Sequence, residues 1–474
     1  MCPHCSTCSP IEVSRPEPTH LVVGADVLSP LRDGGERRYV NLDNAATTPP
    51  LRAVAAAVDE FVARAASVHR GSGYKSRYAT QAYESARDEV AAFVGADPAH
   101  HTVIFTGNTT DAINRLSRRL APELKGTVIV STLLEHHAND LPWRRDAEIV
   151  RARPTAEGGI DLDHLAWLLQ KYRGRCKLVA LTGASNVTGA ITDLRTVARL
   201  AHSVGAEVFV DAAQLVPHRR VDMSGGGDPE ARIDYLAFSA HKMYAPYGAG
   251  ALIAPRAHLE DGEPPIAGGG AVLAVDIDAV HWAPPPAREE AGTPNAVGVI
   301  AMAAAARALM ETGLEAIAEH ERALTARLLA GLRAIPGVTL YGDGRAPTAA
   351  EDRVGVVPFN VAGVPHGLVA AVLGWERAVG VRSGCFCAHP FVKHLLGLTA
   401  EEQVQLTQAT ITGHREELPG LVRASLGLYN TEEDVDLLLE GVRAIAAEPD
   451  AAATRYRFSP ADEEYLPTTT PDHA

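Results

Sequence analysis

The chain has 474 residues, of which 46% are hydrophobic and 22% charged, and its formal net charge is −14 at pH 7. This length and composition predict a folded protein of about two or three domains and exclude disorder for the bulk of the chain. The acidic balance argues against general nucleic-acid binding, which needs a basic face. The lack of a run of about 18 uncharged apolar residues argues against a membrane span.

The first segment, residues 1–38, is rich in Pro, Cys and charge and shows no periodicity, so we expect an arm or tail. It has no basic stretch followed by an apolar run, and a signal peptide is therefore not expected. Six cysteines in a chain of this length do not make a disulfide scaffold, which favours the reducing cytoplasm. Cys2, Cys5 and Cys8 have the spacing of one half of a metal site. We favour a free tail without metal over zinc or iron binding, because a second half of the ligand set is missing.

Short apolar runs alternate with helical patterns over residues 39–298. Helical repeats of apolar residues begin at Leu51 and again at Leu194. The apolar runs are continuous, as in strands that are buried on both faces of a mainly parallel sheet. We therefore expect a large α/β domain with its site at the carboxyl ends of the strands. The predicted strands are Val103–Phe105, Thr127–Ser131, Leu178–Thr182, Glu207–Asp211, Tyr235–Phe238 and Ala251–Ala254.

The pattern changes near residue 295, and residues 299–447 predict a second, smaller α+β domain. A long Ala-rich helix, in two pieces, is expected from Asn295 to about Ile335. Residues 448–474 are polar, with Pro and a Thr run, and we expect a flexible tail there. The further elements predicted for this domain are Val338–Tyr341, Gly355–Val361, a helix around Gly367–Val372 and a helix over Glu432–Ala447.

Two of the predicted strands end in residues suited to cofactor chemistry. Lys242 follows one strand inside a turn of small residues, where a desolvated lysine can lose its proton and form a Schiff base with a carbonyl. Asp211 ends another strand, where a carboxylate can keep a pyridine nitrogen protonated. Taken singly, a solvated loop lysine and a helix N-cap are the more ordinary interpretations.

Two weaker signals follow other strands. Thr109 and Thr110 open a predicted helix, and its backbone N–H groups and hydroxyls could hold a phosphate. His136, after the strand Thr127–Ser131, could stack on an aromatic ring or be a packed structural histidine. Neither signal is specific in isolation.

In this order along the chain, the four signals resemble the class V aminotransferase family, whose enzymes use pyridoxal 5′-phosphate (PLP). Within it the chain is similar to cysteine desulfurases of the selenocysteine-lyase type. The resemblance extends from about Tyr39 to Val442. It implies PLP-dependent fold type I (aspartate-aminotransferase-like), with a mainly parallel seven-stranded sheet in the large domain. The motifs that carry it are Asn41–Thr47, His69–Gly71, Glu135–Asn139, Ser185–Gly189, Val210–Gln214, Ser239–Lys242, Glu290–Asn295, Arg382–Gly384, Cys387–Pro390 and Arg423–Ser425.

The resemblance implies a role for each matching residue. Lys242 would bind PLP covalently, Asp211 would pair with its ring nitrogen, and His136 would stack on the ring. Thr293 would reach the phosphate of a neighbouring subunit, which implies a homodimer. Arg423 would hold the substrate carboxylate as a bidentate clamp. The remaining contacts implied are Gln214 and Asn186 to the ring oxygen, Asn186 also to the substrate, and Thr109, Thr110, Ser239 and His241 to the phosphate.

The reaction depends on Cys387, because the fold and cofactor are shared by several chemistries. By the resemblance, its thiolate would take sulfur from L-cysteine as a persulfide, leave L-alanine, and pass the sulfur to an acceptor protein. The more ordinary interpretation of Cys387 is a small buried cysteine with no chemical role. A class V transaminase, epimerase or C–S lyase that does not use Cys387 is the alternative function. A scaffold without activity is a third interpretation, against which the intact Lys242 argues.

The sequence departs from the family pattern near this cysteine. Cys385 stands where such enzymes usually have histidine, and it could be a second sulfur carrier, a redox partner or an inert replacement. The stretch from Cys387 to Arg423 is longer than expected, and it could act as a lid or change which acceptor docks. Within it, Thr399 and Glu402 have the spacing of a capping box, which predicts a helix start.

Overall fold

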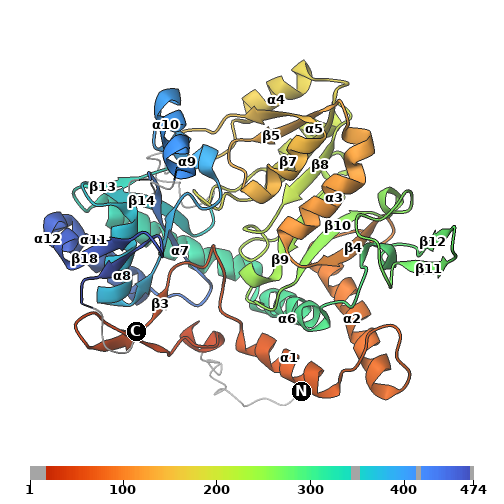
Figure 1. The fold of residues 1–474 in the computed structure, drawn as a ribbon, viewed down its shortest axis with the longest axis horizontal. Coiled ribbons are helices and arrows are strands. Elements are labelled where there is room, and N and C mark those ends of the chain that lie inside the picture. The colour runs from red at the N-terminus through yellow and green to blue at the C-terminus, as the bar shows by residue number, and fades with distance from the viewer. Residues whose placement is uncertain (1–17, 343–352, 413–417, 470–474) are drawn as a thin grey trace, which may run out of the picture.

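The computed structural model describes residues 18–342, 353–412 and 418–469. Its large domain contains a seven-stranded sheet in the order β4-β10-β9-β8-β7-β5-β6 (Figure 1). Strands β5 to β9 pair in parallel, and β10 alone runs antiparallel to its neighbours β4 and β9. The predicted sheet is thus confirmed. Its strands are β4 (His101–Thr106), β5 (Val128–Thr132), β6 (Glu148–Ala152), β7 (Cys176–Thr182), β8 (Glu207–Asp211), β9 (Tyr235–Ser239) and β10 (Gly250–Pro255).

Both faces of this sheet are buried, which explains the continuous apolar runs. In β8, Val208 and Val210 belong to one core cluster and Phe209 to the other, because successive side chains alternate between the faces. Helix α3 packs its apolar side on the second cluster, and the other helices pack on the first. The helices around the sheet are α1 (Arg52–Arg64), α2 (Tyr74–Phe93), α3 (Thr109–Leu124), α4 (Leu162–Lys171), α5 (Leu194–His202) and α6 (Ala296–Thr312).

Strand β6 was not predicted. It forms one edge of the sheet, and its sequence EIVRA is only partly buried. An edge strand of this kind tolerates charged residues, so it lacks the apolar run that marks the central strands. A second unpredicted element of the large domain is the hairpin of β11 (Val272–Val275) and β12 (Val280–Trp282), which projects from the domain (Figure 1).

The small domain contains a four-stranded antiparallel sheet in the order β13-β14-β17-β16. The predicted long helix is two helices, α6 and α7, bent by 77°. Among the described residues no single helix is long and apolar enough to cross a membrane, and these two meet that test only as a bent pair. The elements are β13 (Val338–Leu340), β14 (Val356–Val361), β16 (Arg382–Gly384), β17 (Leu421–Ser425), α7 (Leu314–Arg333), α8 (His366–Arg377) and α11 (Glu432–Ala447).

The longer stretch before Arg423 contains two helices, α9 (His389–Leu395) and α10 (Ala400–Ile411), which stand at one end of the small domain (Figure 1). Thr399 caps α10 as predicted. Its backbone N–H donates to Glu402 Oε2 at 2.7 Å, and its hydroxyl accepts from the Glu402 N–H at 3.3 Å. Helix α10 buries no residue, and its Thr407 hydroxyl accepts a hydrogen bond from Lys393 Nζ of α9 at 3.2 Å.

The two ends of the chain contain more regular structure than the sequence predicts. Before Tyr39, where an arm is expected, β1 (Leu28–Pro30) and β2 (Glu36–Arg38) form a hairpin. Next, β3 (Val40–Asn41) pairs in parallel with β15 (Val379–Gly380) of the small domain. Where a flexible tail is expected after residue 447, the structure forms α12 (Pro449–Arg455) and a hairpin of β18 (Tyr456–Ser459) and β19 (Glu464–Pro467). Cys2, Cys5 and Cys8 lie outside the described residues.

The terminal hairpin is attached through buried side chains. Tyr456 is 5% exposed and joins the core of the small domain, and its hydroxyl donates to Glu376 Oε1 at 3.3 Å. Arg455 forms an ion pair with the same carboxylate at 2.9 Å. The segment is polar in composition, but Arg455 and Tyr456 anchor it. Through Glu376 these two residues tie residues 449–467 to α8.

Replacing Tyr456 with alanine therefore tests whether this segment is part of the folded domain. Truncating a buried aromatic side chain costs about 3–5 kcal/mol of unfolding free energy. We expect a clearly lower urea midpoint for Tyr456→Ala, followed by circular dichroism. Tyr74, which is 75% exposed, supplies the control Tyr74→Ala. Equal midpoints for the two variants would mean that the hairpin contributes nothing to stability.

Candidate active site

The floor of the site lies where β8 and β9 end side by side. Asp211, the last residue of β8, is buried, and its Oδ1 accepts a hydrogen bond from the Ala213 N–H at 3.0 Å. Lys242 ends the short helix η6 (Ala240–Lys242), which follows β9 directly. Burial raises the pKa of Asp211 and lowers the pKa of Lys242 to about 8, and each charge opposes the other's shift. The amine therefore lies close to deprotonation at neutral pH, as a nucleophilic lysine requires.

One end of the site is built for an anion. Thr109 is the first residue of the 16-residue helix α3, and the Asn108 side chain caps that helix. Ser239, at the end of β9, accepts a hydrogen bond from the Thr109 N–H at 2.8 Å, and the two hydroxyls are 2.6 Å apart. Thr110 is exposed at the same helix start. The positive end of a helix dipole together with hydroxyl groups is an anion-binding arrangement.

Two histidines border the floor in their neutral forms. Burial and the Lys242 charge lower the pKa of His136 and of His241 to about 4. The Nδ1 atom of His136 accepts from the Ala138 N–H at 3.1 Å, which assigns the remaining proton to Nε2. A neutral, oriented imidazole is suited to lie against a flat aromatic ring.

Glu135, the first residue of the motif Glu135–Asn139, is a structural residue of the site. Its buried carboxyl accepts from the Thr132 hydroxyl at 2.5 Å, the Thr182 N–H at 3.1 Å and Asn139 Nδ2 at 2.6 Å. It thus ties the ends of β5 and β7 to the helix η2 (His137–Asn139) directly beside His136. An acidic residue between a buried strand and a histidine pair is the signal that could have identified it.

Gln214 leaves one polar atom without a partner. Its Nε2 donates to the Ala45 carbonyl at 2.6 Å, but its Oε1 is buried and has no hydrogen bond within the described part of the chain. Buried polar atoms are nearly always paired, so this atom fits a site that a bound group completes. An amine for an aldehyde, a carboxylate for a ring nitrogen and a helix start for a phosphate match the functional groups of PLP.

Arg423 lies buried on β17 and its guanidinium is held from several sides. Nη1 donates to the Asn186 carbonyl at 2.9 Å, Nη2 donates to Asp43 Oδ1 at 3.0 Å, and the group lies 4.7 Å from the centre of the Phe386 ring. Its Nε is buried and has no hydrogen-bond partner among the described residues. Asp43 also pairs with Arg382 at 2.9 Å. Sequence reasoning assigned Arg423 but missed Asp43 and Phe386, which orient it.

Cys387 sits on a strained turn between β16 and α9. The Ala388 N–H donates to the Cys385 carbonyl at 2.8 Å, and the two central residues, Phe386 and Cys387, have φ values of 52° and 54°. Both angles are positive, as in a type I′ turn, at a cost of about 1–3 kcal/mol for each non-glycine residue. The turn is fastened to the large domain, because the Cys387 carbonyl accepts from the His137 N–H at 2.7 Å and the Phe386 carbonyl accepts from Asn186 Nδ2 at 2.7 Å.

The exposed Cys387 completes the group around Lys242. Its turn is hydrogen-bonded to His137, the neighbour of His136, and to Asn186, whose own carbonyl accepts from Arg423, so the cysteine belongs to the same site. Thr293 is the exception among the predicted residues. It is exposed in the loop before α6, and in the described chain no hydrogen bond joins it to the others.

Comparison with known proteins gives the class of protein. The family described as "Aminotransferase class-V" matches residues 40–438, so the chain belongs to this family. The probable cysteine desulfurase 2 of Mycobacterium leprae is 37% identical over 425 residues, 87% of this chain and 92% of that protein. A cysteine desulfurase of Klebsiella pneumoniae is 35% identical over 424 residues, 87% and 95% of the two chains. The apo structure of cysteine desulfurase from Thermococcus onnurineus NA1 aligns with a TM-score of 0.75 and 33% identity, and covers 86% of this chain and 95% of that one. These matches confirm the expected fold type I.

The depressed pKa of His136 predicts a pH dependence of stability. The folded-state value of about 4 lies below the ordinary value of 6.5, so the unfolded chain takes up a proton first as pH falls. Stability is therefore lost on going from about pH 6.5 towards 4. In His136→Gln, the slope of unfolding free energy against pH in this range should fall, by at most the amount that corresponds to the uptake of about one proton on unfolding. The same change at exposed His394 is the control, and equal slopes in both variants would contradict a neutral His136.

Proposed function

We propose that this protein is a PLP-dependent cysteine desulfurase that converts L-cysteine to L-alanine and holds the sulfur as a persulfide on Cys387. One observation carries the proposal. Cys387 lies on a turn whose carbonyls are hydrogen-bonded to His137, the neighbour of His136, and to Asn186, which also binds Arg423. The cysteine desulfurases that are 33–37% identical over most of the chain support the same activity.

Each residue of the floor has a place in holding PLP. The Lys242 amine would bind its aldehyde, and the Asp211 carboxyl would keep a proton on its ring nitrogen. Bound PLP supplies an acceptor for the electron pair of the substrate's α-carbon. His136 would lie against the ring. The ring oxygen would face Gln214 and Asn186, and the phosphate would face Thr109, Thr110, Ser239 and His241.

The substrate would be oriented by Arg423 and attacked by Cys387. Each Nη of Arg423 retains a second proton beyond those given to Asn186 and Asp43, so a carboxylate can still be bound. The Cys387 thiolate forms an S–S bond to the substrate sulfur as the C–S bond breaks, and the carbon fragment takes up a proton to become alanine. Once free, the Lys242 amine, with its pKa of about 8, can carry that proton.

We infer that the working unit is a homodimer. Thr293 lies exposed in the loop before α6, and a second copy could receive it at the phosphate. The cysteines that the structure describes, Cys176, Cys385 and Cys387, are all free thiols, as persulfide chemistry in the cytoplasm requires. The sulfur would then pass to an acceptor protein.

The test is alanine formation by the PLP-loaded protein with L-cysteine and a thiol reductant. Cys387→Ala should lower the rate by at least about a hundredfold, because it removes the nucleophile. Cys176→Ala, which changes a buried cysteine of β7, is the matched control. Alanine formed by Cys387→Ala at the parent rate would refute the persulfide role of Cys387. Pyruvate, ammonia and sulfide formed without Cys387 would support a C–S lyase instead, and a sulfur-bearing 2-oxo acid or racemised cysteine would support a transaminase or epimerase.

A second prediction concerns the carboxylate site. Lysine cannot keep the bonds to Asn186 and Asp43 and also bind a carboxylate, so Arg423→Lys should weaken substrate binding. Loss of a charge-assisted hydrogen bond worth about 1.5–3 kcal/mol corresponds to a KM raised roughly 10- to 150-fold. Steady-state kinetics check this, with Arg377→Lys on the small domain as control. An unchanged KM in Arg423→Lys would show that the carboxylate binds elsewhere.

A further inference from the structure

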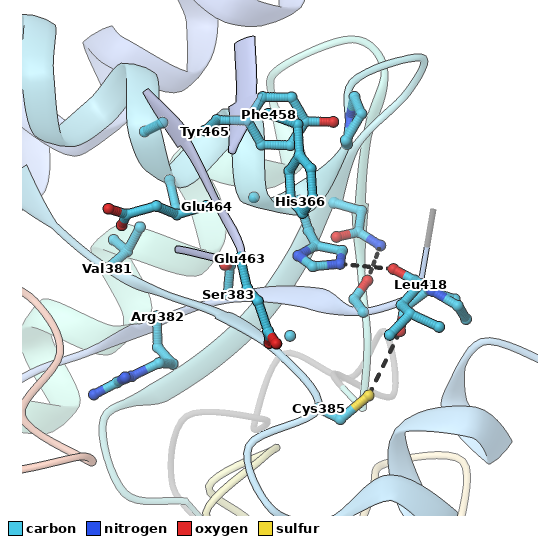
Figure 2. Close-up of a pocket in the computed structure, with 18 of the residues that line it drawn as sticks. His366, Val381, Arg382, Ser383, Cys385, Leu418, Phe458, Glu463, Glu464 and Tyr465 are labelled. Carbon is cyan, nitrogen blue, oxygen red and sulfur yellow. Dashed lines mark hydrogen bonds between the residues drawn. The ribbon is translucent and has the colours of Figure 1, made fainter. Parts of the chain in front are cut away.

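The two cysteines of the catalytic turn face different spaces. Cys387 is exposed, and its turn is hydrogen-bonded to His137 and Asn186 of the candidate active site. Cys385 is half-buried, and its thiol donates to the Pro419 carbonyl at 3.5 Å. It lines a groove of about 1380 Å³ in the small domain, to which Cys387 does not contribute (Figure 2). The turn therefore separates one thiol on the substrate side from another on a second opening.

This small-domain groove runs along β16 between α8 and the terminal hairpin β18–β19. Phe458 and Tyr465 of the hairpin and His366 of α8 line its far part, and Cys385 lies towards the opposite end (Figure 2). Lys393 and His389 of α9 border the groove near the turn. The groove is large enough for a thiol-bearing molecule or side chain to approach Cys385, and at another part of its lining Asp43 and Arg382 adjoin the Arg423 site.

The turn also keeps the two thiols close to each other. Cys385 and Cys387 are the first and third residues of the turn that the Ala388 N–H closes at 2.8 Å. Burial is the main cause that raises the pKa of Cys385; the Lys393 ammonium lowers this pKa, and a charge on Cys387 raises it further. A thiolate of higher pKa is the stronger nucleophile once it forms. Cys385 is thus placed to attack a sulfur carried by its neighbour.

We propose that Cys385 is a second sulfur carrier, which takes the outer sulfur from the Cys387 persulfide and presents it in the small-domain groove. This rests on the proposed desulfurase function. The Cys385 thiolate attacks the outer sulfur, an S–S bond forms to Cys385, and the S–S bond to Cys387 breaks. Cys387 leaves as a thiolate and takes up the proton that Cys385 lost. One persulfide replaces another, so nothing is oxidised or reduced overall.

The experiment locates sulfur on each cysteine of the PLP-loaded protein during turnover. The protein is mixed with L-cysteine without reductant, quenched with iodoacetamide at intervals and cleaved with trypsin. Both thiols lie on one peptide, residues 383–393 between Arg382 and Lys393, and fragmentation in a mass spectrometer assigns the extra sulfur to either. We expect it on Cys387 first and on Cys385 afterwards, with up to two extra sulfurs on the peptide.

Variants establish the direction of transfer. Cys385→Ser and Cys385→Ala should carry sulfur on Cys387 only, so the peptide gains one sulfur instead of two. Cys387→Ser should carry none on Cys385. Cys176→Ala should match the parent. The visible absorbance of bound PLP checks that each variant is folded. The order in which sulfur appears on the two cysteines is read from the parent protein, so that result does not depend on the folding of any variant.

Three results would overturn the proposal. Sulfur that stays on Cys387 alone throughout the time course would show that Cys385 is inert. A disulfide between the two cysteines with released sulfide would show attack on the inner sulfur, a redox role. Sulfur on Cys385 in Cys387→Ser would show that it loads directly. In each of these three results the unsubstituted protein still forms alanine, so the proposed desulfurase function stands. If the unsubstituted protein forms no alanine, the proposed function itself is refuted.

Discussion

The pocket depends on one buried pair of opposite charges, the amine of Lys242 and the carboxyl of Asp211. Parallel pairing of β8 with β9 brings these two residues to the same edge of the sheet. Taking either charge out of water costs several kcal/mol, and each partner offsets part of that cost for the other. The result is an amine with a pKa of about 8 beside a carboxyl whose pKa is raised. The apolar core on both faces of β8 and β9 holds this pair in place.

The turn that carries Cys387 is docked on the large domain through backbone carbonyls. The carbonyls of Phe386 and Cys387 accept hydrogen bonds from Asn186 and His137 of the large domain. Such contacts position the turn whatever side chains it carries, so the residue beside the nucleophile can change without loss of the docking geometry. Side chains also cross the same boundary, among them Arg423, which pairs with Asp43, and Asp43 also binds Arg382.

The sequence predicted well the parts that local pattern controls. The run Glu207–Asp211 is β8 residue for residue, and Glu432–Ala447 is α11. Thr399 and Glu402 form the expected capping box. Strand β6 and the terminal hairpin were missed, because an edge strand needs no apolar run and the hairpin is anchored by a few scattered residues, among them the buried Tyr456 and the ion pair of Arg455. Glu135 and Asp43 were given no role, since their importance lies in partners distant in the chain.

By itself the sequence determined which chemical groups the protein has and in what order they follow its strands. Lysine, aspartate, a helix start and a cysteine before Ala-His-Pro are readable there because each occupies a local pattern. Only the tertiary structure decided the environment of each group. Burial by distant segments lowers the pKa of Lys242 and of His136, and two positive φ angles on one turn direct Cys385 and Cys387 to different openings. Desolvation and side-chain direction are set by contacts between segments far apart in the chain, and no local pattern encodes those.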